Sequence, residues 1–264
     1  MARVFWLPTE CLQPDRDALP RAIELPGAKM LPRTIFFPPE ERHHILHVLR
    51  KKAGDKVDVL CGSQRLQVEL VFRGEQLLGK ILQTQPIQPP PFSLDLAQGL
   101  PKGRKMEQVV TLAAQVGVHR LLPFHSLRSI PRLDSPEGRR KRERWQRLAD
   151  EEAKVTGCPP LQVAPLSPLE EILQISAGLR LFCWENAERS LLDALEKAPT
   201  FPDAGILVIG PEGGFAPEEA QLAESAGFQA VNLGERILRT EVAGLVAAVL
   251  ILEHGGAFRL SSSP

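Results

Sequence analysis

The sequence predicts an α/β protein with a largely parallel sheet, preceded by a small β-barrel domain. Beyond residue 92, apolar runs alternate with helical stretches, which is typical of strands joined by crossover helices. Before residue 84, short runs rich in Val and Leu are separated by Gly, as in a β-meander or barrel. Residues 85–91 contain four prolines, which favour an extended connector because proline lacks an amide proton. We therefore expect a front domain over residues 1–84, a linker over 85–91 and a back domain over 92–264.

The front domain is expected to combine one helix with short strands. Residues 34–37 have strand composition, and Pro38 and Pro39 then begin a helix, since proline suits a first helical turn. Glu40 and Glu41 fall in that turn, where the helix dipole favours acidic side chains. The helix is expected to end near residues 50–52, and further strands are predicted over residues 56–61, 66–72 and 77–82.

The back domain is expected to alternate strands and helices. The predicted strands are residues 92–97, 118–123, 179–184, 205–209 and 230–233. The predicted helices are residues 106–115, 137–155, 169–176, 190–197, 217–226 and 240–254. Because ligands bind beyond the carboxyl ends of such strands, loops that directly follow a strand are the candidate sites.

Composition and cysteine usage are those of an ordinary globular protein. The 264 residues are 43% hydrophobic and 24% charged, enough for one large domain or for a small and a medium one. No apolar run reaches about 18 residues and no signal-peptide core is present, so we expect no membrane contact and a cytoplasmic location. The cysteines form no CxxC pair, which argues against a disulfide framework and a zinc ribbon; they are Cys11, Cys61, Cys158 and Cys183.

Charge is distributed unevenly along the chain, although the formal net charge is zero. Residues 101–154 carry 13 Lys and Arg against 7 Asp and Glu, whereas residues 155–264 carry 6 against 14. Such asymmetry indicates either nucleic-acid contact by the basic part or a solvated charged helix, and charge alone does not separate the two.

The first candidate loop is residues 209–215 (Ile-Gly-Pro-Glu-Gly-Gly-Phe), which follow an apolar strand. Its three glycines allow positive φ and let a ligand approach the backbone closely. The motif is neither GxGxxG nor a P-loop, which disfavours a dinucleotide or ATP site. A tight strand-to-helix turn is the alternative to a cofactor site.

The second candidate loop, residues 233–241, also joins a strand to a helix. We expect Thr240 to cap that helix and Glu241 to lie in its first turn. Arg239 would hold an anionic or carbonyl-bearing group, or form a surface pair with Glu241. Residues 242–252 are apolar on nearly every face, so this helix must be buried in a core or against another subunit.

These motifs resemble those of the 16S rRNA uridine N3-methyltransferases of the SPOUT superfamily. The resemblance runs in order from about Thr34 to the C-terminus. Its two most specific parts are GPEGGF at residues 210–215 and LGxxILRTE at residues 233–241. The other matching segments are HHILHVLR at 43–50 and Gly54-Asp55, similar to the family's PUA-like domain, then KGRKME at 102–107, GV at 117–118, LP at 122–123 and the basic helix around Arg144.

The resemblance implies a trefoil-knot methyltransferase domain, a homodimer formed through it and S-adenosyl-L-methionine as cofactor. It also implies that the partner is 16S rRNA in the small ribosomal subunit, and that no metal is needed. The residues it places at the cofactor are Trp184, Glu185, Ile209, Gly210, Glu212, Gly213, Gly214, Leu233, Gly234, Ile237, Leu238 and Thr240.

Methylation at N3 of uridine requires that the N3 proton leave first, because its pKa lies well above neutral. We expect Arg239 to stabilise the charge that develops on the uracil carbonyls. Glu241 is expected to orient Arg239 or the base, and Arg104 is the second candidate for contact with the target.

Basic residues of the first 154 positions are the expected RNA contacts, together with one histidine. They are Arg33, His44, Arg50, Lys51, Lys52, Lys102, Lys105 and Arg128, with the run at residues 139–144 as a further candidate that a solvated helix face would also explain. His43 and His47 lie one helical turn apart, as in a metal site. No glutamate follows the first histidine and no further ligand cluster completes a site, so structural or RNA-facing histidines are favoured.

Four positions depart from the family pattern. Leu112 and Gln115 stand near an expected lysine and an expected acidic residue, and Lys154 and Cys158 replace an acid and an arginine after the basic helix. We expect these positions to line the RNA or active-site side. They leave open a methyltransferase that acts on another RNA, such as a tRNA base or ribose, and a non-catalytic rRNA-binding assembly factor.

Overall fold

The computed structural model describes residues 4–7, 11–13, 34–126, 136–197 and 201–259. By their contacts the residues form two compact units. The front unit comprises Met1–Gln88 and Lys154–Pro159, and the back unit comprises Pro89–Ala153 and Pro160–Pro264. Among the described residues, no helix is long and apolar enough to cross a membrane.

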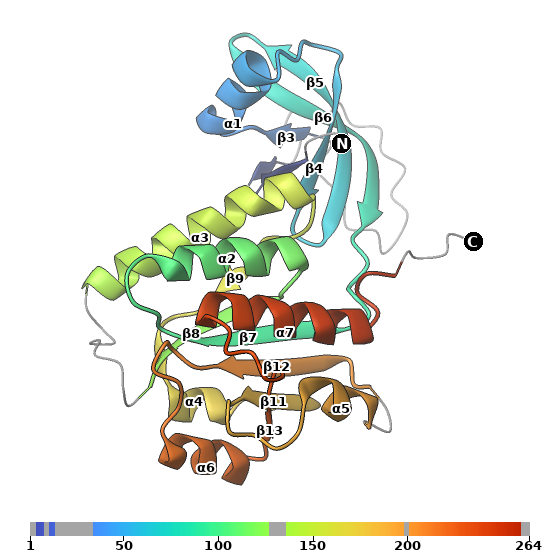
Figure 1. Cartoon of the computed structure of the whole chain (residues 1–264). Coiled ribbons are helices and arrows are strands. Elements are labelled where there is room, and N and C mark those ends of the chain that lie inside the picture. The colour runs from blue at the N-terminus through green and yellow to red at the C-terminus, as the bar shows by residue number, and fades with distance from the viewer. Residues whose placement is uncertain (1–3, 8–10, 14–33, 127–135, 198–200, 260–264) are drawn as a thin grey trace. The chain divides into compact units, whose positions relative to one another are not determined.

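The front unit is built on a six-stranded sheet with the order β1-β4-β5-β6-β3-β2 (Figure 1). Its strands are β1 (Phe5–Leu7), β2 (Leu12–Gln13), β3 (Thr34–Phe36), β4 (Lys56–Cys61), β5 (Gln64–Arg73) and β6 (Gln76–Pro86). β1 pairs with β4 in parallel, and the other pairs are antiparallel. Along β5, Leu66, Val68 and Leu70 are buried and alternate with more exposed residues, so one face of the sheet covers the core.

The front helix begins at Pro39, as predicted, but changes its hydrogen-bonding pattern after one turn. α1 (Pro39–His43) continues directly into a π-helix, η2 (His44–Val48). Arg50 follows with a φ of 53°, a left-handed conformation that a non-glycine residue seldom adopts. Wide helical turns and left-handed residues are concentrated at functional segments, and here they lie next to Lys51 and Lys52.

The back unit contains a seven-stranded parallel sheet, which confirms the predicted α/β fold class. The order is β10-β8-β7-β12-β11-β13, with β9 paired to β8. The strands are β7 (Ser93–Gly99), β8 (Arg120–His125), β9 (Gln162–Val163), β10 (Ser167–Pro168), β11 (Leu179–Cys183), β12 (Ala204–Ile209) and β13 (Gln229–Val231).

Helices cover both faces of this sheet. Along β12, Leu207 and Ile209 belong to one core cluster, whereas Ile206 and Val208 belong to another, as the alternation of a strand requires. The first cluster is closed by α2 (Lys105–Val116), α3 (Pro136–Thr156), α5 (Leu191–Glu196) and α7 (Thr240–His254). The second is closed by α4 (Leu169–Leu173) and α6 (Pro217–Ser225). α7 lies beside α2 and packs on β7 and β12 (Figure 1).

Candidate cofactor and active site

The candidate site lies where four neighbouring strands of the back unit end. β7, β12, β11 and β13 are adjacent and parallel, so the segments that follow them leave the sheet at one edge. These segments carry Gly99, the glycine loop after Ile209, the pair Trp184-Glu185 and the loop that begins at Asn232. α7 begins at the same edge, since Thr240 contacts Gly210. Open parallel sheets bind ligands at such an edge.

The glycine loop after β12 is shaped by close contacts that exclude side chains. A Cβ on Gly210 would lie 2.9 Å from the Phe215 ring. Gly214 has a φ of +62°, and a Cβ there would lie 2.9 Å from Glu185 Oε1, at the end of β11. Glycine is therefore favoured at both positions, at Gly210 by the close approach of Phe215 and at Gly214 by its positive φ.

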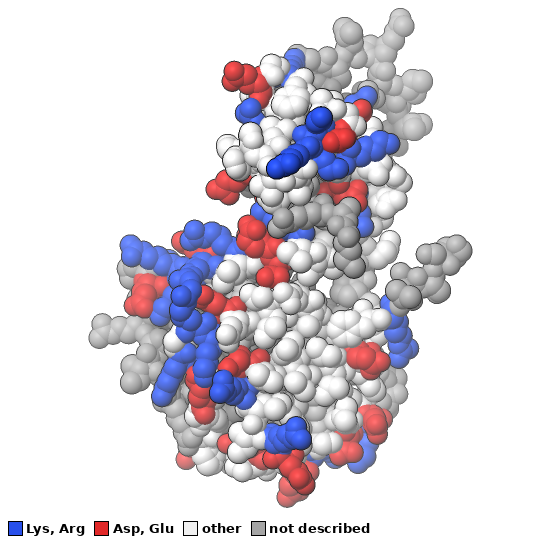
Figure 2. All heavy atoms as spheres, turned by 45° about the horizontal axis from the view of Figure 1, so that its top comes forward, with Lys and Arg blue, Asp and Glu red and all other residues white. Residues whose placement is uncertain are grey.

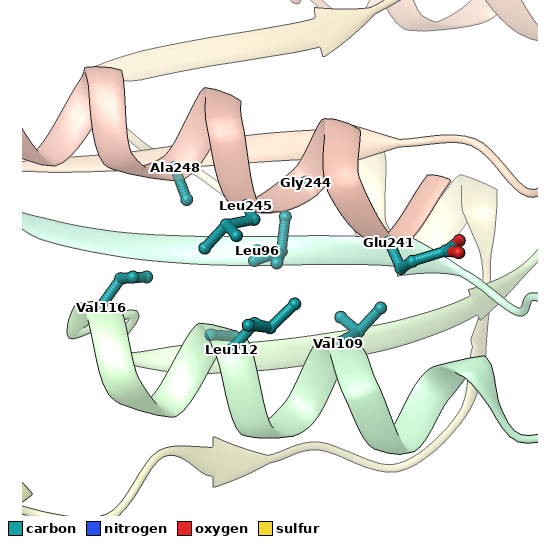
Figure 3. A pocket seen from close by; sticks show the side chains of 9 residues that line it. Leu96, Val109, Leu112, Val116, Glu241, Gly244, Leu245 and Ala248 are labelled. Atoms are coloured by element: carbon teal, nitrogen blue, oxygen red, sulfur yellow. The ribbon is translucent and has the colours of Figure 1, made fainter. Parts of the chain in front are cut away.

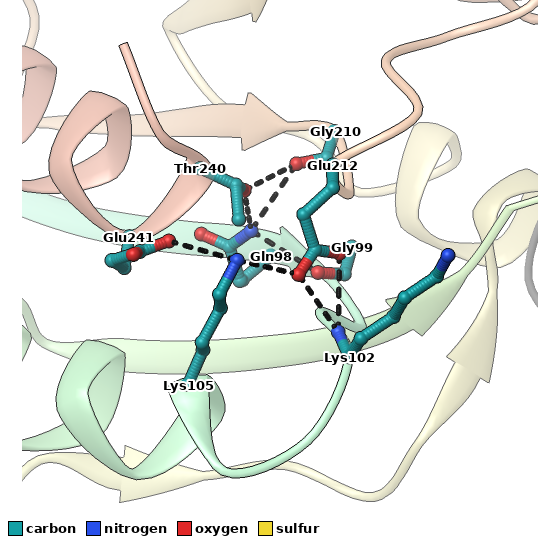
Figure 4. Close-up of polar contacts among 8 residues, drawn as sticks. All are labelled: Gln98, Gly99, Lys102, Lys105, Gly210, Glu212, Thr240 and Glu241. Atoms are coloured by element: carbon teal, nitrogen blue, oxygen red, sulfur yellow. Dashed lines mark hydrogen bonds and ion pairs between the residues drawn. The ribbon is translucent and has the colours of Figure 1, made fainter.

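Glu212 is held by the segment that enters α2. Its carboxylate accepts hydrogen bonds from the Lys102 backbone N–H (3.0 and 3.1 Å) and from Lys105 Nζ (2.8 Å; Figure 4). Partial burial alone would raise the pKa of Glu212, but the hydrogen bonds from Lys105 and from backbone amides outweigh it, and the pKa lies below its usual value. Lys105, predicted as an RNA contact, is thus placed against two carboxylates of the site.

Glu241 is the second carboxylate beside Lys105. It is 8% exposed, and its Oε2 lies 3.9 Å from Lys105 Nζ. The alternative of an Arg239–Glu241 surface pair is not what the structure has, because the ion pair of Glu241 is formed with Lys105. Arg239 itself is exposed and immediately precedes α7.

Thr240 does not cap α7, so that prediction is wrong. The N-cap residue is Arg239, and no side chain caps the helix. The Thr240 hydroxyl is buried and donates instead to the Gly210 carbonyl at 2.5 Å. The reason is that α7 begins next to the glycine loop, where the buried Gly210 carbonyl needs a hydrogen-bond donor.

Gln98, which was not among the predicted site residues, completes this network. Its side chain is 0% exposed, and its Nε2 donates to Thr240 Oγ1 at 2.8 Å. A polar residue directly after the apolar run at 92–97 was the available signal, since buried polar side chains at strand ends are placed for a reason.

Two of the other predicted cofactor residues, Trp184 and Ile237, have a group that is either without a hydrogen-bond partner in the described part of the chain or exposed, and that is available to a ligand. The Trp184 indole N–H is buried and has no hydrogen-bond partner in the described part of the chain. The Ile237 side chain is 94% exposed, in the loop between β13 and α7. Gly234 has a φ of +94°, and its N–H donates to Asn232 Oδ1 at 3.1 Å. A buried donor and a fully exposed apolar side chain are both suited to a ligand with polar and apolar parts.

A narrow pocket between α2 and α7 lies next to this network. Glu241 stands at one end of it and apolar side chains line the rest (Figure 3). The lining residues are Leu96, Val109, Leu112, Ala113, Val116, Glu241, Gly244, Leu245 and Ala248. Leu112 therefore contributes to an apolar helix–helix surface. Gln115 donates to Glu152 Oε2 on α3 at 3.0 Å.

Arg104 and the predicted RNA-contact residues lie on exposed surface with a few exceptions. Arg104 pairs with Glu107 at 3.1 Å, and this hydrogen bond is the first cause of the lowered pKa of Glu107. His44 packs its ring edge-on against Phe5, with centroids 6.1 Å apart, so it is partly turned to the core of the front unit. Lys102 is exposed, as are Arg50 and Lys52, and Lys51 is half-buried. Arg33 and Arg128 lie outside the described residues.

The basic run of α3 is exposed. Figure 2 shows Lys and Arg gathered in a band on one side of the face drawn. The exposed basic side chains of α3 are Arg139, Arg140, Lys141, Arg142, Arg144 and Arg147.

His43 and His47, one helical turn apart, have ring centroids 4.7 Å apart. Within the described ranges, no group of three His, Cys, Asp or Glu side chains is placed to hold a metal ion.

The chain is similar in sequence to known RNA methyltransferases. A family model described as an RNA methyltransferase domain matches residues 88–252. The chain is 31% identical over 232 residues to the ribosomal RNA small subunit methyltransferase E of Synechocystis, covering 84% of this chain and 74% of that protein. It is 29% identical over 220 residues to the enzyme of the same name from Bacillus subtilis, covering 79% and 85% respectively.

A solved structure shows the same fold. The ribosomal RNA small subunit methyltransferase E of Neisseria gonorrhoeae, bound to S-adenosyl methionine, superposes with a TM-score of 0.75 at 24% identity. The match covers 96% of this chain and 98% of that one, so it includes both units.

Proposed function

Because the chain belongs to the ribosomal RNA small subunit methyltransferase E family, we propose that it transfers a methyl group from S-adenosyl-L-methionine to N3 of one uridine in 16S rRNA. The observation that carries this proposal is the meeting of the glycine loop with the ends of β11 and β13 and the start of α7. The two motifs that define the resemblance are thereby brought to one edge of the sheet.

The residues at this edge fit the cofactor. The loop from Gly210 to Gly214 carries three glycines, so a ligand can approach its backbone closely, and Gly213 is exposed. The Trp184 N–H and the exposed Ile237 supply a buried donor and an apolar cover. When bound, S-adenosylmethionine supplies an activated methyl group. The residues that would hold it are Trp184, Glu185, Ile209, Gly210, Glu212, Gly213, Gly214, Leu233, Gly234, Ile237, Leu238 and Thr240.

The charge at this edge also suits a sulfonium cation. Lys105 faces two carboxylates, Glu212 and Glu241, so the three side chains together carry one net negative charge. An uncompensated negative charge in a partly buried position attracts a cation more strongly than it would in water. Glu241 and Lys105 are therefore positioning groups of the site, in place of the Arg239–Glu241 contact that the sequence suggested.

Arg239 is the group assigned to the acceptor base. Its guanidinium is exposed at the start of α7, and a fixed positive charge there lowers the free energy of a uridine anion through the uracil carbonyl oxygens. Arg104 is the second candidate. The target uridine must be unstacked or flipped before these groups can reach it.

The surfaces assigned to rRNA are the turn at Arg50, Lys51 and Lys52 in the front unit, called the basic turn below, and the basic side chains near α2 and α3. They comprise Arg50, Lys51, Lys52, Lys102 and the exposed basic residues of α3, with Arg33 and Arg128 in segments outside the described residues. We further assign to this chain the trefoil knot and the cytoplasmic homodimer implied by the resemblance.

Methyl transfer to separated RNA classes tests the proposal. The purified protein is incubated with labelled S-adenosylmethionine and, in parallel, with unmodified small ribosomal subunits, large subunits or tRNA. The proposal predicts label in small-subunit RNA alone. Label in tRNA would identify another acceptor, and cofactor binding without label in any RNA would favour a non-catalytic assembly factor.

A further inference from the structure

Gln98 joins three chain segments that meet at the proposed cofactor site. It lies near the carboxyl end of β7, and its Nε2 donates to Thr240 Oγ1 (2.8 Å), to the Gly99 carbonyl (3.1 Å) and to the Gly210 carbonyl (3.4 Å; Figure 4). We propose that Gln98 is a positioning residue for methyl transfer, which fixes the Gly210 carbonyl and the start of α7 and thereby the shape of the cofactor loop. This inference rests on the proposed function.

The orientation of the Gln98 amide follows from its partners. The Thr240 hydroxyl has one proton, and it donates this proton to the Gly210 carbonyl at 2.5 Å. The hydroxyl oxygen must therefore accept, and only the NH₂ end of the amide can donate to it. A reversed amide would place Oε1 against two carbonyl oxygens and a hydroxyl without a free proton, so the network admits one arrangement.

The Gly210 carbonyl is a point at which the loop can be held. Gly210 is buried and its neighbour Phe215 leaves no room for a side chain, so its backbone is the only polar group it can offer. Two donors, from Gln98 and Thr240, converge on that carbonyl. Two residues further along, Glu212 is held by Lys102 and Lys105. The loop is thus fixed from β7, from α2 and from α7.

The Oε1 end of the Gln98 amide indicates that the N–H groups, rather than the carbonyl oxygen, are the useful part of this side chain. Gln98 Oε1 is buried and has no hydrogen-bond partner among the described residues. It lies 3.2 Å from the position of a Cβ on Gly244, so a glycine in α7 makes room for the amide. A buried acceptor without a partner is unfavourable, and methionine, of similar length, would avoid it. The N–H groups are what glutamine adds at this position.

Cofactor affinity of matched variants tests the inference. Gln98→Met removes the amide and Thr240→Val removes the hydroxyl, and Gln221→Met makes the same change as the first variant at an exposed position of α6. The dissociation constant for S-adenosylmethionine is measured by calorimetry at a temperature where circular dichroism shows each protein folded.

We expect Gln98→Met to raise this constant about tenfold, the effect of one lost buried hydrogen bond, and Gln221→Met to leave it unchanged. Gln98→Met and Thr240→Val together should weaken binding by clearly less than the product of the single effects, because both act on the Gly210 carbonyl.

Wild-type affinity in Gln98→Met, with only a lower melting temperature, would show a merely structural role and overturn the inference. If the double variant raises the dissociation constant by the full product of the two single effects, Gln98 and Thr240 do not act through the same Gly210 carbonyl. If Gln98→Met does not fold, wild-type affinity in Thr240→Val refutes the inference. Absence of cofactor binding by the unmodified protein would instead refute the proposed function itself.

Discussion

At the scale of single residues, the candidate site is organised by a few charged and polar side chains rather than by a cluster of classical acid–base groups. Lys105 faces Glu212 and Glu241, and Gln98 and Thr240 hold the Gly210 carbonyl. These contacts fix a loop, and Arg239, which we propose contacts the acceptor, is exposed. Such an arrangement suits a reaction in which alignment and charge stabilisation supply most of the rate.

Replacement of Arg239 should separate catalysis from cofactor binding. We expect Arg239→Ala to lower kcat by about 100-fold, the usual loss when one charge-stabilising donor is removed, with cofactor affinity near that of the unmodified protein. Arg236→Ala, at an exposed arginine of the same loop, is the matched control. If both variants turn over alike, Arg239 has no part in the reaction.

The lowered pKa of Glu212 predicts a pH dependence of stability. A carboxyl whose pKa is lowered by folding stabilises the native state above its unfolded pKa and loses this contribution as pH falls through the folded pKa. The difference in unfolding free energy between the wild type and Glu212→Gln should therefore be largest above pH 4.5 and shrink below it. Urea unfolding from pH 3 to 7 measures this difference. A gap that grows toward acid pH would contradict the assignment, and Glu218→Gln at an exposed site is the control.

At the scale of elements, the end of α3 explains one departure from the family pattern. Lys154 Nζ lies 2.6 Å from Glu41 Oε1 on α1, within the front unit, and both side chains are largely buried. The acidic residue that the resemblance led us to expect at this position would face Glu41 with like charge. The lysine therefore has an oppositely charged partner within the front unit.

Reversing the charge of Lys154 should destabilise the protein, and reversing the charge of Glu41 as well should restore stability. Lys154→Glu should lower the unfolding free energy by about 3 kcal/mol, since it leaves a buried carboxylate unpaired. Combining it with Glu41→Lys should restore most of that loss, as urea unfolding would show. A double variant as unstable as the two single variants combined would mean that the pair does not interact.

Elements with long apolar runs could be predicted, whereas four of the shortest strands could not. α7 spans Thr240–His254, the predicted range, because its apolar run is long and begins after a strand-terminating loop. β1, β2, β9 and β10 have two or three residues, too few for a periodic signal. The role of Thr240 depends on a contact between segments distant in sequence, which no local pattern contains.

At the scale of the whole molecule, the family, the parallel α/β architecture and the enzyme class could all be predicted from the sequence. The glycine loop follows β12, and the loop that carries the ILRTE motif follows β13 in the same sheet. The Gln98 network escaped prediction because it joins residues more than 100 positions apart, and only the strand order brings them together.

The uneven charge of the chain predicts a salt-sensitive complex with rRNA. Affinity should fall by about 10³ or more between 50 and 200 mM salt if six or more phosphates are contacted. Lys51→Ala with Lys52→Ala should reduce the slope of this dependence by about two, whereas Lys56→Ala, at an exposed residue of β4, should not. Filter binding at several salt concentrations measures the slopes, and equal slopes for all three proteins would exclude the basic turn from the interface.

The measurement that tests the account most directly is nucleoside mass spectrometry of small-subunit RNA after incubation with the protein and S-adenosylmethionine. We expect one new N3-methyluridine, formed by the unmodified protein and strongly reduced with Arg239→Ala. A methyl group on ribose or on another base would contradict the assigned acceptor, and unchanged RNA despite measurable cofactor binding would contradict the assigned reaction.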